Sequence, residues 1–138
     1  MKELKVRDIM NREVHTLGRN DKLSIADDLM KQARIRHIPV LDKSGKLCGV
    51  VSQRDLFRGA LLKALGYGSY LEDKMLDKLV VKEIMRDEIH AISPDEPISA
   101  AAKTMLANQI GCLPVVEDDK VVGIVSESDL VRLVASGA

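Results

Sequence analysis

The chain has 138 residues, 46% hydrophobic and 30% charged, a composition and length that suit one compact globular module. Its 21 basic and 21 acidic side chains cancel, which argues against a dedicated nucleic-acid or membrane-surface binder, because both need excess positive charge. Residues 1–69 nevertheless hold 14 basic and 8 acidic side chains, against 7 and 13 in residues 70–138. No apolar run is long enough to span a bilayer, and Cys48 and Cys112 are too few for a disulfide framework. We therefore expect a cytoplasmic protein.

An internal repeat organises the chain. Residues 6–10 (VRDIM) recur as residues 81–85 (VKEIM), an offset of 75 that falls to 74 after a one-residue deletion in the turn following Asp42. Over residues 6–58 we count 18 identities in 52 aligned pairs, which chance does not explain. The sequence therefore predicts one compact module built of two repeats, with bounds at residues 1–69 for the first repeat, 70–80 for a linker with a short helix, and 81–138 for the second repeat.

Each repeat is predicted to form a βαββα unit, so the fold class is α+β. In the first repeat the expected elements are a strand over 14–17, a helix from a cap at Asp21 to about 35, strands over 37–41 and 47–51 joined by a turn at 42–45, and a helix over 53–65. In the second repeat the pattern predicts a strand over 89–92, a helix whose first residue is Pro97, and a closing helix over 127–134. One such unit leaves a sheet face bare, so we expect two units to pack through their sheets.

Catalytic signatures are missing from the sequence. It contains no P-loop, no Gly-x-Ser-x-Gly elbow and no His-Glu-x-x-His motif. His15 and His90 occupy matching apolar strands without a carboxylate or thiol at ligand spacing, so we expect them to be structural and predict no metal site. The sequence thus predicts a protein that is not an enzyme, with no catalytic residue.

The most faithfully repeated segment reads Gly-aliphatic-Val-Ser-x-x-Asp, at residues 49–55 and 123–129. One interpretation is a capping box, in which Ser52 or Ser126 caps a helix and the acid sits at its third position. The other is a nucleotide site. A helix that opens at the end of a buried strand offers amides, a dipole and a hydroxyl to phosphate, and its acid can hold ribose hydroxyls. The glycine lets backbone or ligand approach closely.

The base of such a nucleotide would lie on apolar strand residues. These are 14–17 and 38–39 in the first repeat, with counterparts at 89–92 and 113–114. The chain has no Trp, one Phe and two Tyr, so no aromatic shelf is available and backbone amides of these strands would read the base edge.

Charge separates the two candidate sites. Near the first motif stand Arg34, Arg36, His37, Arg54 and Arg58, and the matching positions of the second repeat are Gln109, Gly111, Cys112, Ser128 and Arg132. We hypothesise that the first site prefers a di- or triphosphate held by Arg36 and Arg54. The second site would take a monophosphate, an adenosyl-sulfonium or nothing. The alternative is that the arginines form an ordinary solvated basic helix face.

The repeated motifs carry a family resemblance over roughly residues 4–134. Aliphatic-x-Asp/Glu-x-Met, then Leu/Ile-Pro-Val-aliphatic-Asp/Glu, then Gly-aliphatic-Val-Ser-x-x-Asp-Leu resembles a cystathionine-beta-synthase (CBS) domain, and two in tandem resemble a CBS pair, or Bateman module. The resemblance implies pseudo-twofold-related repeats and two clefts between them that bind AMP, ADP, ATP or S-adenosylmethionine. It also implies a disc-shaped homodimer.

The resemblance further implies roles for individual residues. The family's Ser/Thr meets phosphate and its Asp holds ribose, roles that fall on Ser52 with Asp55 and on Ser126 with Asp129. The residues expected to line the two sites are Thr16, Arg36, His37, Ile38, Pro39, Ser52, Arg54 and Asp55 in the first repeat, and Ala91, Cys112, Leu113, Pro114, Ser126, Ser128 and Asp129 in the second. Thr16 is the usual residue at its position, whereas Ala91 departs from the family pattern.

The sequence thus predicts a regulatory module that binds an adenosine-containing ligand, with or without Mg²⁺, and requires no other cofactor. Since no effector domain is present, its signal would pass to an effector protein or through a change of oligomer. Two alternatives stay open: a purely structural dimerisation module whose capping boxes are only caps, and a weak nucleic-acid binder using the basic first half.

Overall fold

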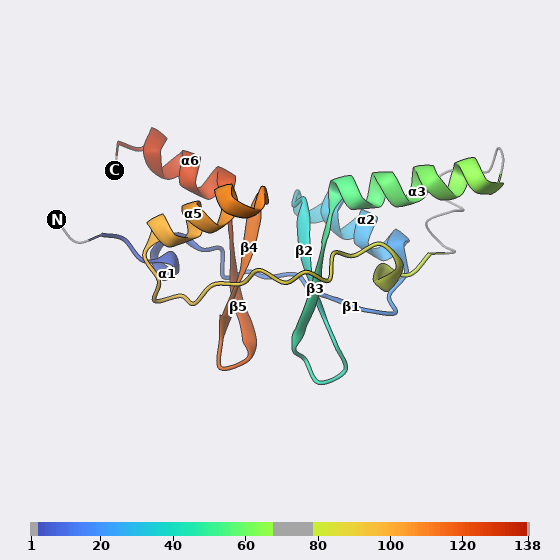
Figure 1. Cartoon of the computed structure of the whole chain (residues 1–138), viewed down its shortest axis with the longest axis horizontal. Helices are drawn as coiled ribbons and strands as arrows, with labels where there is room; N and C mark the ends of the chain where they lie inside the picture. The colour runs from blue at the N-terminus through green and yellow to red at the C-terminus, as the bar shows by residue number, and fades with distance from the viewer. Residues whose placement is uncertain (1–2, 68–78, 138) are drawn as a thin grey trace. The chain divides into compact units, whose positions relative to one another are not determined.

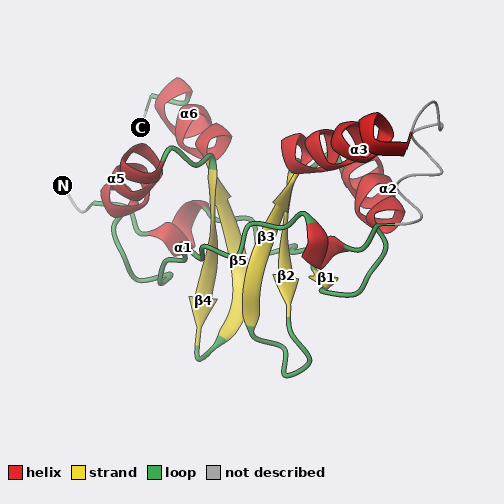
Figure 2. Ribbon diagram, turned by 45° about the vertical axis from the view of Figure 1, so that its right-hand side comes forward, coloured by secondary structure: helices red, strands yellow, loops and turns green. Residues whose placement is uncertain are grey.

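The computed structural model describes residues 3–67 and 79–137, without the side chains of 60 and 62–67. These residues form two compact units, each a small sheet with helices (Figures 1 and 2). We call His15–Ile89 the central unit, and Met1–Val14 together with His90–Ala138 the terminal unit. The predicted mixture of helices and strands in two repeats is confirmed.

The central unit contains a three-stranded sheet and two long helices. Its elements are β1 (Leu17–Gly18), α2 (Leu23–Ala33), β2 (His37–Leu41), β3 (Leu47–Ser52), α3 (Gln53–Tyr67) and a short 3₁₀ helix (Val81–Glu83). Strand β1 runs parallel to β2, which pairs antiparallel with β3, and α2 lies beside α3 (Figure 1).

The terminal unit repeats this plan. Its elements are α1 (Val6–Ile9), α5 (Ile98–Asn108), β4 (Cys112–Glu117), β5 (Lys120–Ser126) and α6 (Glu127–Ala135). Strands β4 and β5 form an antiparallel hairpin that leads directly into α6 (Figure 2). The predicted hairpins and closing helices of both repeats are therefore confirmed, with bounds that differ by at most two residues.

The two hairpins differ at their turns, which is where the repeat loses one residue. In the β2–β3 turn, Asp42 accepts hydrogen bonds from the backbone N–H groups of Ser44 (2.9 Å) and Lys46 (3.0 Å), and Gly45 takes a φ of +85°. In the β4–β5 turn, Asp118 and Asp119 both have positive φ, 53° and 65°. Two central residues with positive φ make the tight turn that matches strand twist, so the shorter connection still closes the hairpin.

Helices α2 and α5 bury matching faces and end in the same way. Ala26 and Met30 of α2, and Ala101 and Met105 of α5, are all buried. Both helices then terminate at a residue with left-handed backbone, Arg34 (φ 56°) and Gln109 (φ 54°). This cap turns the chain back toward the following strand and satisfies the last carbonyls.

Each repeat opens with a short helical segment, α1 in the first repeat and the 3₁₀ helix (Val81–Glu83) in the second. Each of these segments packs in the unit that contains the other repeat's strands. In the terminal unit the Val6 N–H donates to the Glu96 carbonyl (2.8 Å), and in the central unit the Val81 N–H donates to the Asp21 carbonyl (2.8 Å). Both valine side chains are fully buried. The compact units therefore do not coincide with the sequence repeats: residues up to Val14 belong to the terminal unit, and residues from the opening of the second repeat up to Ile89 belong to the central unit.

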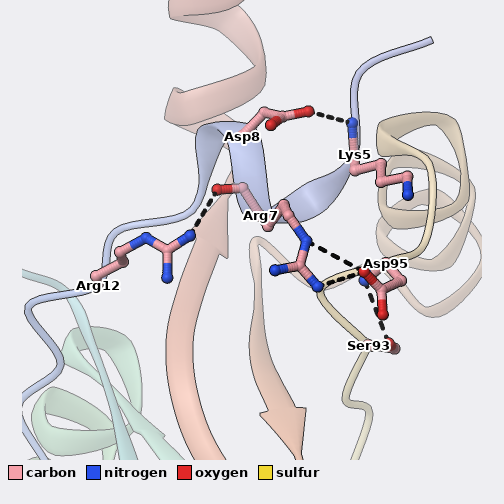
Figure 3. A network of polar contacts seen from close by, with 6 residues as sticks. All are labelled: Lys5, Arg7, Asp8, Arg12, Ser93 and Asp95. Carbon is pink, nitrogen blue, oxygen red and sulfur yellow. Dashed lines mark hydrogen bonds and ion pairs between the residues drawn. The ribbon is translucent and has the colours of Figure 1, made fainter. Parts of the chain in front are cut away.

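Polar contacts fasten α1 within the terminal unit (Figure 3). The Arg7 guanidinium forms an ion pair with Asp95, whose N–H donates to Ser93 Oγ (3.3 Å). The Lys5 N–H donates to Asp8 Oδ2 (2.8 Å) at the start of α1. At the positions of the central unit that match Arg7 and Asp95 stand Lys82 and Asn20, a pair that carries only one charge.

Several predicted boundaries are wrong. The strand expected over 14–17 begins only at Leu17, and the strand expected over 89–92 reduces to a single bridge between Ile92 and Val115. These short segments use parallel pairing at one or two residues only, because the chain turns into the next helix almost at once.

The predicted helix starts also need correction. Asp21 does not cap α2, since its Oδ2 accepts the Gly18 N–H (2.7 Å) and Lys22 occupies the capping position. Pro97 precedes α5 as the capping residue rather than being its first helical residue. The linker helix expected within residues 70–80 lies almost wholly outside the described residues; Leu79, at its end, is buried.

Candidate functional site

Each unit carries one repeated motif at the junction of a strand and a helix. Strand β3 ends at Ser52, where α3 begins, and β5 ends at Ser126, where α6 begins. In both places the polar motif residues follow directly after a fully buried valine, Val51 in β3 and Val125 in β5. The sequence prediction of a helix opening at a strand's end is therefore confirmed in both repeats.

In the central unit the motif forms a closed capping box. The Asp55 N–H donates to Ser52 Oγ (3.0 Å), and the Ser52 N–H donates to Asp55 Oδ2 (3.0 Å). The Gln53 N–H donates to the Arg36 carbonyl (2.8 Å), which ties the helix start to the residue before β2. Asp55 is 6% exposed and is the only buried charged residue in the described part of the chain.

In the terminal unit the motif has the same backbone but a wider side-chain network. The Ser126 N–H donates to Asp129 Oδ2 (2.8 Å), and the Ser126 hydroxyl lies 3.1 Å from that oxygen and 2.9 Å from Ser128 Oγ. The Glu127 N–H donates to the Gly111 carbonyl (2.9 Å), as its counterpart does in the central unit. Serine hydroxyls and carboxylates thus converge on both helix starts.

Both motif carboxylates also contact an arginine, but the two arginines come from different places. In the terminal unit Arg132, one turn along α6, lies 3.1 Å from Asp129 Oδ1. In the central unit Arg86 lies with its Nε 3.3 Å from Asp55 Oδ1. Sequence reasoning missed Arg86, because it follows the opening motif of the second repeat and nothing in its own repeat signals that this segment packs in the central unit.

Strand register sets the predicted base-contacting residues beside the motif. His37 pairs with Ser52 across β2 and β3, and Cys112 pairs with Ser126 across β4 and β5. The next residues, Ile38 and Leu113, have fully buried side chains that belong to the hydrophobic cores of their units. Of these two residues only the backbone is suited to meet a ligand, as the hypothesis of base recognition by amides requires.

The other predicted site residues fall into two groups. The prolines that follow the base-contacting residues are buried, while the polar and small candidates are exposed. The buried members are Pro39 and Pro114, and the exposed members are Thr16, Arg36, Arg54, Ala91 and Ser128. Thr16 immediately precedes the Leu17–Val40 parallel pair, so the structure brings it to the strand adjoining the motif.

The cysteines are poor nucleophiles. Burial, reinforced by the nearby Glu127 carboxylate, raises the pKa of the Cys112 thiol to about 12, and partial burial raises the pKa of Cys48 as well. Both thiols are free. Within residues 3–67 and 79–137 no group of three or more His, Cys, Asp or Glu side chains could hold a metal ion, and no helix is long and apolar enough to cross a membrane.

The family model for the CBS domain matches residues 6–61 and again residues 81–136. The chain belongs to the CBS domain family. The two matches cover both repeats.

Solved structures similar to this chain are also CBS domain pairs. The CBS domain pair of protein MJ0100, solved with 5′-methylthioadenosine and S-adenosyl-L-methionine, is 28% identical with a TM-score of 0.80, and the match covers 99% of this chain and 100% of that one. CBSX2 in complex with AMP is 26% identical with a TM-score of 0.76, covering 96% and 97%. AcuB from Vibrio cholerae is 35% identical with a TM-score of 0.80, covering 98% and 93%.

Relatives in sequence include longer proteins. A homoserine O-acetyltransferase of Methanococcoides burtonii is 32% identical over 130 residues, and protein MJ1426 of Methanocaldococcus jannaschii is 30% identical over 150 residues. The match to the acetyltransferase covers 94% of this chain but only 24% of the acetyltransferase. The match to MJ1426 covers 92% of this chain and 89% of MJ1426. The chain thus spans about a quarter of the acetyltransferase relatives that it matches.

Proposed function

We propose that this CBS pair is a regulatory module that binds an adenosine-containing ligand, AMP, ADP, ATP or S-adenosylmethionine, and performs no chemistry on it. The observation that carries the proposal is the duplicated helix start, where a Ser and an Asp are hydrogen-bonded to each other at the end of a strand in both units. Similar pairs were solved with AMP and with S-adenosyl-L-methionine, and their likeness to this chain extends over nearly its whole length.

The helix start of α3 offers donors suited to a phosphate. The Gln53 N–H donates to the Arg36 carbonyl and the Asp55 N–H to Ser52 Oγ, and between them lies the Arg54 N–H. An amide in the first turn of a helix has no acceptor within that helix. Such an amide, aligned with the positive end of the helix dipole, binds anions. The exposed guanidinium of Arg54 would add a charge-assisted contact at the same place.

The carboxylate of Asp55 keeps room for a sugar. A carboxylate presents about four acceptor positions. The Ser52 N–H occupies one and Arg86 Nε another, which leaves acceptor capacity for the paired hydroxyls of a ribose. Asp129 in the terminal unit accepts from the Ser126 N–H, the Ser126 hydroxyl and Arg132, which leaves it less free acceptor capacity than Asp55 has.

Ligand-induced stabilisation tests the proposal. The full chain is melted with AMP, ATP, S-adenosylmethionine or 5′-methylthioadenosine, each with and without Mg²⁺. A ligand at about 100 times its Kd adds about 2.7 kcal/mol to the free energy of unfolding. We expect a shift for at least one ligand and its loss in the Asp55→Asn, Asp129→Asn double variant. No shift with any ligand would overturn the proposal.

A purely structural interaction module is the second candidate. Both motif carboxylates already satisfy capping amides, so the motif has a role without any ligand. In addition, Phe57 and Val131 occupy matching positions on α3 and α6 and are 63% and 65% exposed. Exposed apolar residues at such positions suit association of two copies, and we propose a homodimer through these helices, read by an effector protein. Sedimentation of a Phe57→Ser, Val131→Ser variant as a dimer would exclude this interface.

A further inference from the structure

Arg86 is tied to the first motif by its backbone and by its side chain. Its backbone exchanges two hydrogen bonds with Val50 of β3, each 3.0 Å long, two residues before Ser52. Its Nε lies 3.3 Å from Asp55 Oδ1, while 57% of its side chain remains exposed. The strand pairing therefore fixes the backbone of Arg86 beside the motif, and more than half of its side chain stays exposed to solvent.

The terminal unit has no charge at the equivalent place. Asn11 exchanges the same two backbone hydrogen bonds with Ile124 of β5, at 2.9 and 3.0 Å. Its side chain turns away from the motif, since Asn11 Oδ1 accepts the Glu13 N–H (3.0 Å). The two motifs therefore share a backbone frame but differ in the source of the arginine that meets the carboxylate. In the central unit it is Arg86, 31 positions from Asp55, and in the terminal unit it is Arg132 of α6 itself.

This charge affects which ligands the first site can take. A nearly buried carboxylate that binds the ribose lies close to the phosphate on that ribose. The two negative groups repel each other, and this repulsion is weakly screened where water is excluded. A guanidinium that pairs with the carboxylate through Nε cancels this repulsion and still presents two terminal nitrogens, which bind phosphate oxygens well.

We propose that Arg86 is a specificity-determining residue of the first site, which makes that site select adenosyl ligands that carry phosphate over uncharged ones. The inference rests on the proposed ligand-binding function. It concerns Arg86, which comes from the opening segment of the second repeat, in addition to Arg36 and Arg54 of the first. The second site has Asn11 at this place, and its carboxylate is met by Arg132 from its own helix instead.

Calorimetric titration with ATP, AMP and adenosine tests the inference. All variants carry Asp129→Asn, which weakens the second site, so that the measured affinities are those of the first site. In Arg86→Gln we expect ATP affinity to fall about tenfold or more, the usual size of a lost charge-assisted contact, AMP affinity to fall less, and adenosine affinity to stay unchanged. Arg86→Lys restores much of the ATP affinity. The control is Lys46→Gln, which removes an exposed cation from the β2–β3 turn, at the end of the hairpin opposite to Ser52, and it leaves all three affinities unchanged.

The outcomes separate three explanations. Equal losses for adenosine and ATP would mean that Arg86 only orients Asp55, and unchanged affinities for all three ligands would mean that it plays no part; either result overturns the inference while leaving the ligand-binding function intact. If the protein with native Arg86 binds none of the three but retains its fold, the inference fails, and the melts with S-adenosylmethionine and 5′-methylthioadenosine then decide the proposed function.

Discussion

The thioether sulfur of Met85 lies directly over the backbone of Gly49. A Cβ at Gly49 would stand 2.8 Å from Met85 Sδ and 2.9 Å from the carbonyl oxygen of Arg86. Gly123 has the same relationship to Met10, whose Sδ would lie 2.6 Å from a Cβ there. The sequence suggested that this glycine admits either backbone or ligand, and in both units it admits the opening segment of the other repeat.

The first prediction concerns this contact. We expect Gly49→Ala to lower the free energy of unfolding by about 1–3 kcal/mol, because the added methyl overpacks a site bounded by backbone and cannot be relieved by a side-chain movement alone. Urea unfolding followed by circular dichroism measures the change. Gly18→Ala is the control, since its nearest neighbour would be an Asp21 oxygen at 3.6 Å. Equal stability of the two variants would contradict the close approach.

A second prediction compares two leucines of the terminal unit. Leu113 is fully buried and Leu106 is 81% exposed. Leu113→Ala should cost about 2–5 kcal/mol, because it removes buried methyl groups and leaves a cavity. Leu106→Ala should change stability by less than about 0.5 kcal/mol. Chemical unfolding of both variants measures the difference, and a small effect at Leu113 would show that the β4 core is misassigned.

The third prediction is a loss of stability at alkaline pH caused by Cys112. Burial raises the pKa of this thiol from 9.0 to about 12. Between these values the unfolded chain has lost the proton and the folded chain still holds it, so the unfolded state binds fewer protons and stability falls as pH rises. The stabilising contribution is complete below pH 9 and declines by about 1 kcal/mol per pH unit above it.

Cys112→Ala isolates this effect from the titration of Tyr and Lys residues. We expect the variant to lose stability less steeply than the native chain between pH 9 and 10.5, measured by urea unfolding at a series of pH values. Parallel curves for the two proteins would mean that the thiol ionises in the folded state as easily as in the unfolded one.

The fourth prediction concerns the number of phosphates on the ligand. If Arg36 and Arg54 hold phosphates in the first site, native protein should bind ATP more tightly than AMP, and AMP more tightly than adenosine. Arg54→Ala should weaken ATP binding by about tenfold, the scale of one lost charge-assisted hydrogen bond. Titration calorimetry gives the affinities. Identical values for the three ligands, or no loss on substitution, would reduce these arginines to a solvated helix face.

Local patterns predicted the helices, hairpins and motif helix starts because each is written in consecutive residues. The Ser52–Asp55 capping box, for example, follows from a spacing of three. What the sequence did not reveal depends on pairings between distant residues. The exchange of opening segments, and with it the contact of Arg86 with Asp55, cannot be predicted from local sequence. Nothing in residues 81–86 indicates which of the two units this segment packs in. The short strands were misplaced for a related reason, because one or two bridging residues carry too little pattern.

The exchanged opening segments bear on how such a chain could arise. In a single repeat of this design, the opening segment (Val-x-x-x-Met) would have no second repeat to pack against, and the strand glycine would stay uncovered. Such a repeat would be complete only as a dimer in which two polypeptides exchange their opening segments. Fusion of two gene copies would preserve this exchanged packing within one chain. The two opening segments could then diverge separately, to arginine at position 86 and asparagine at position 11.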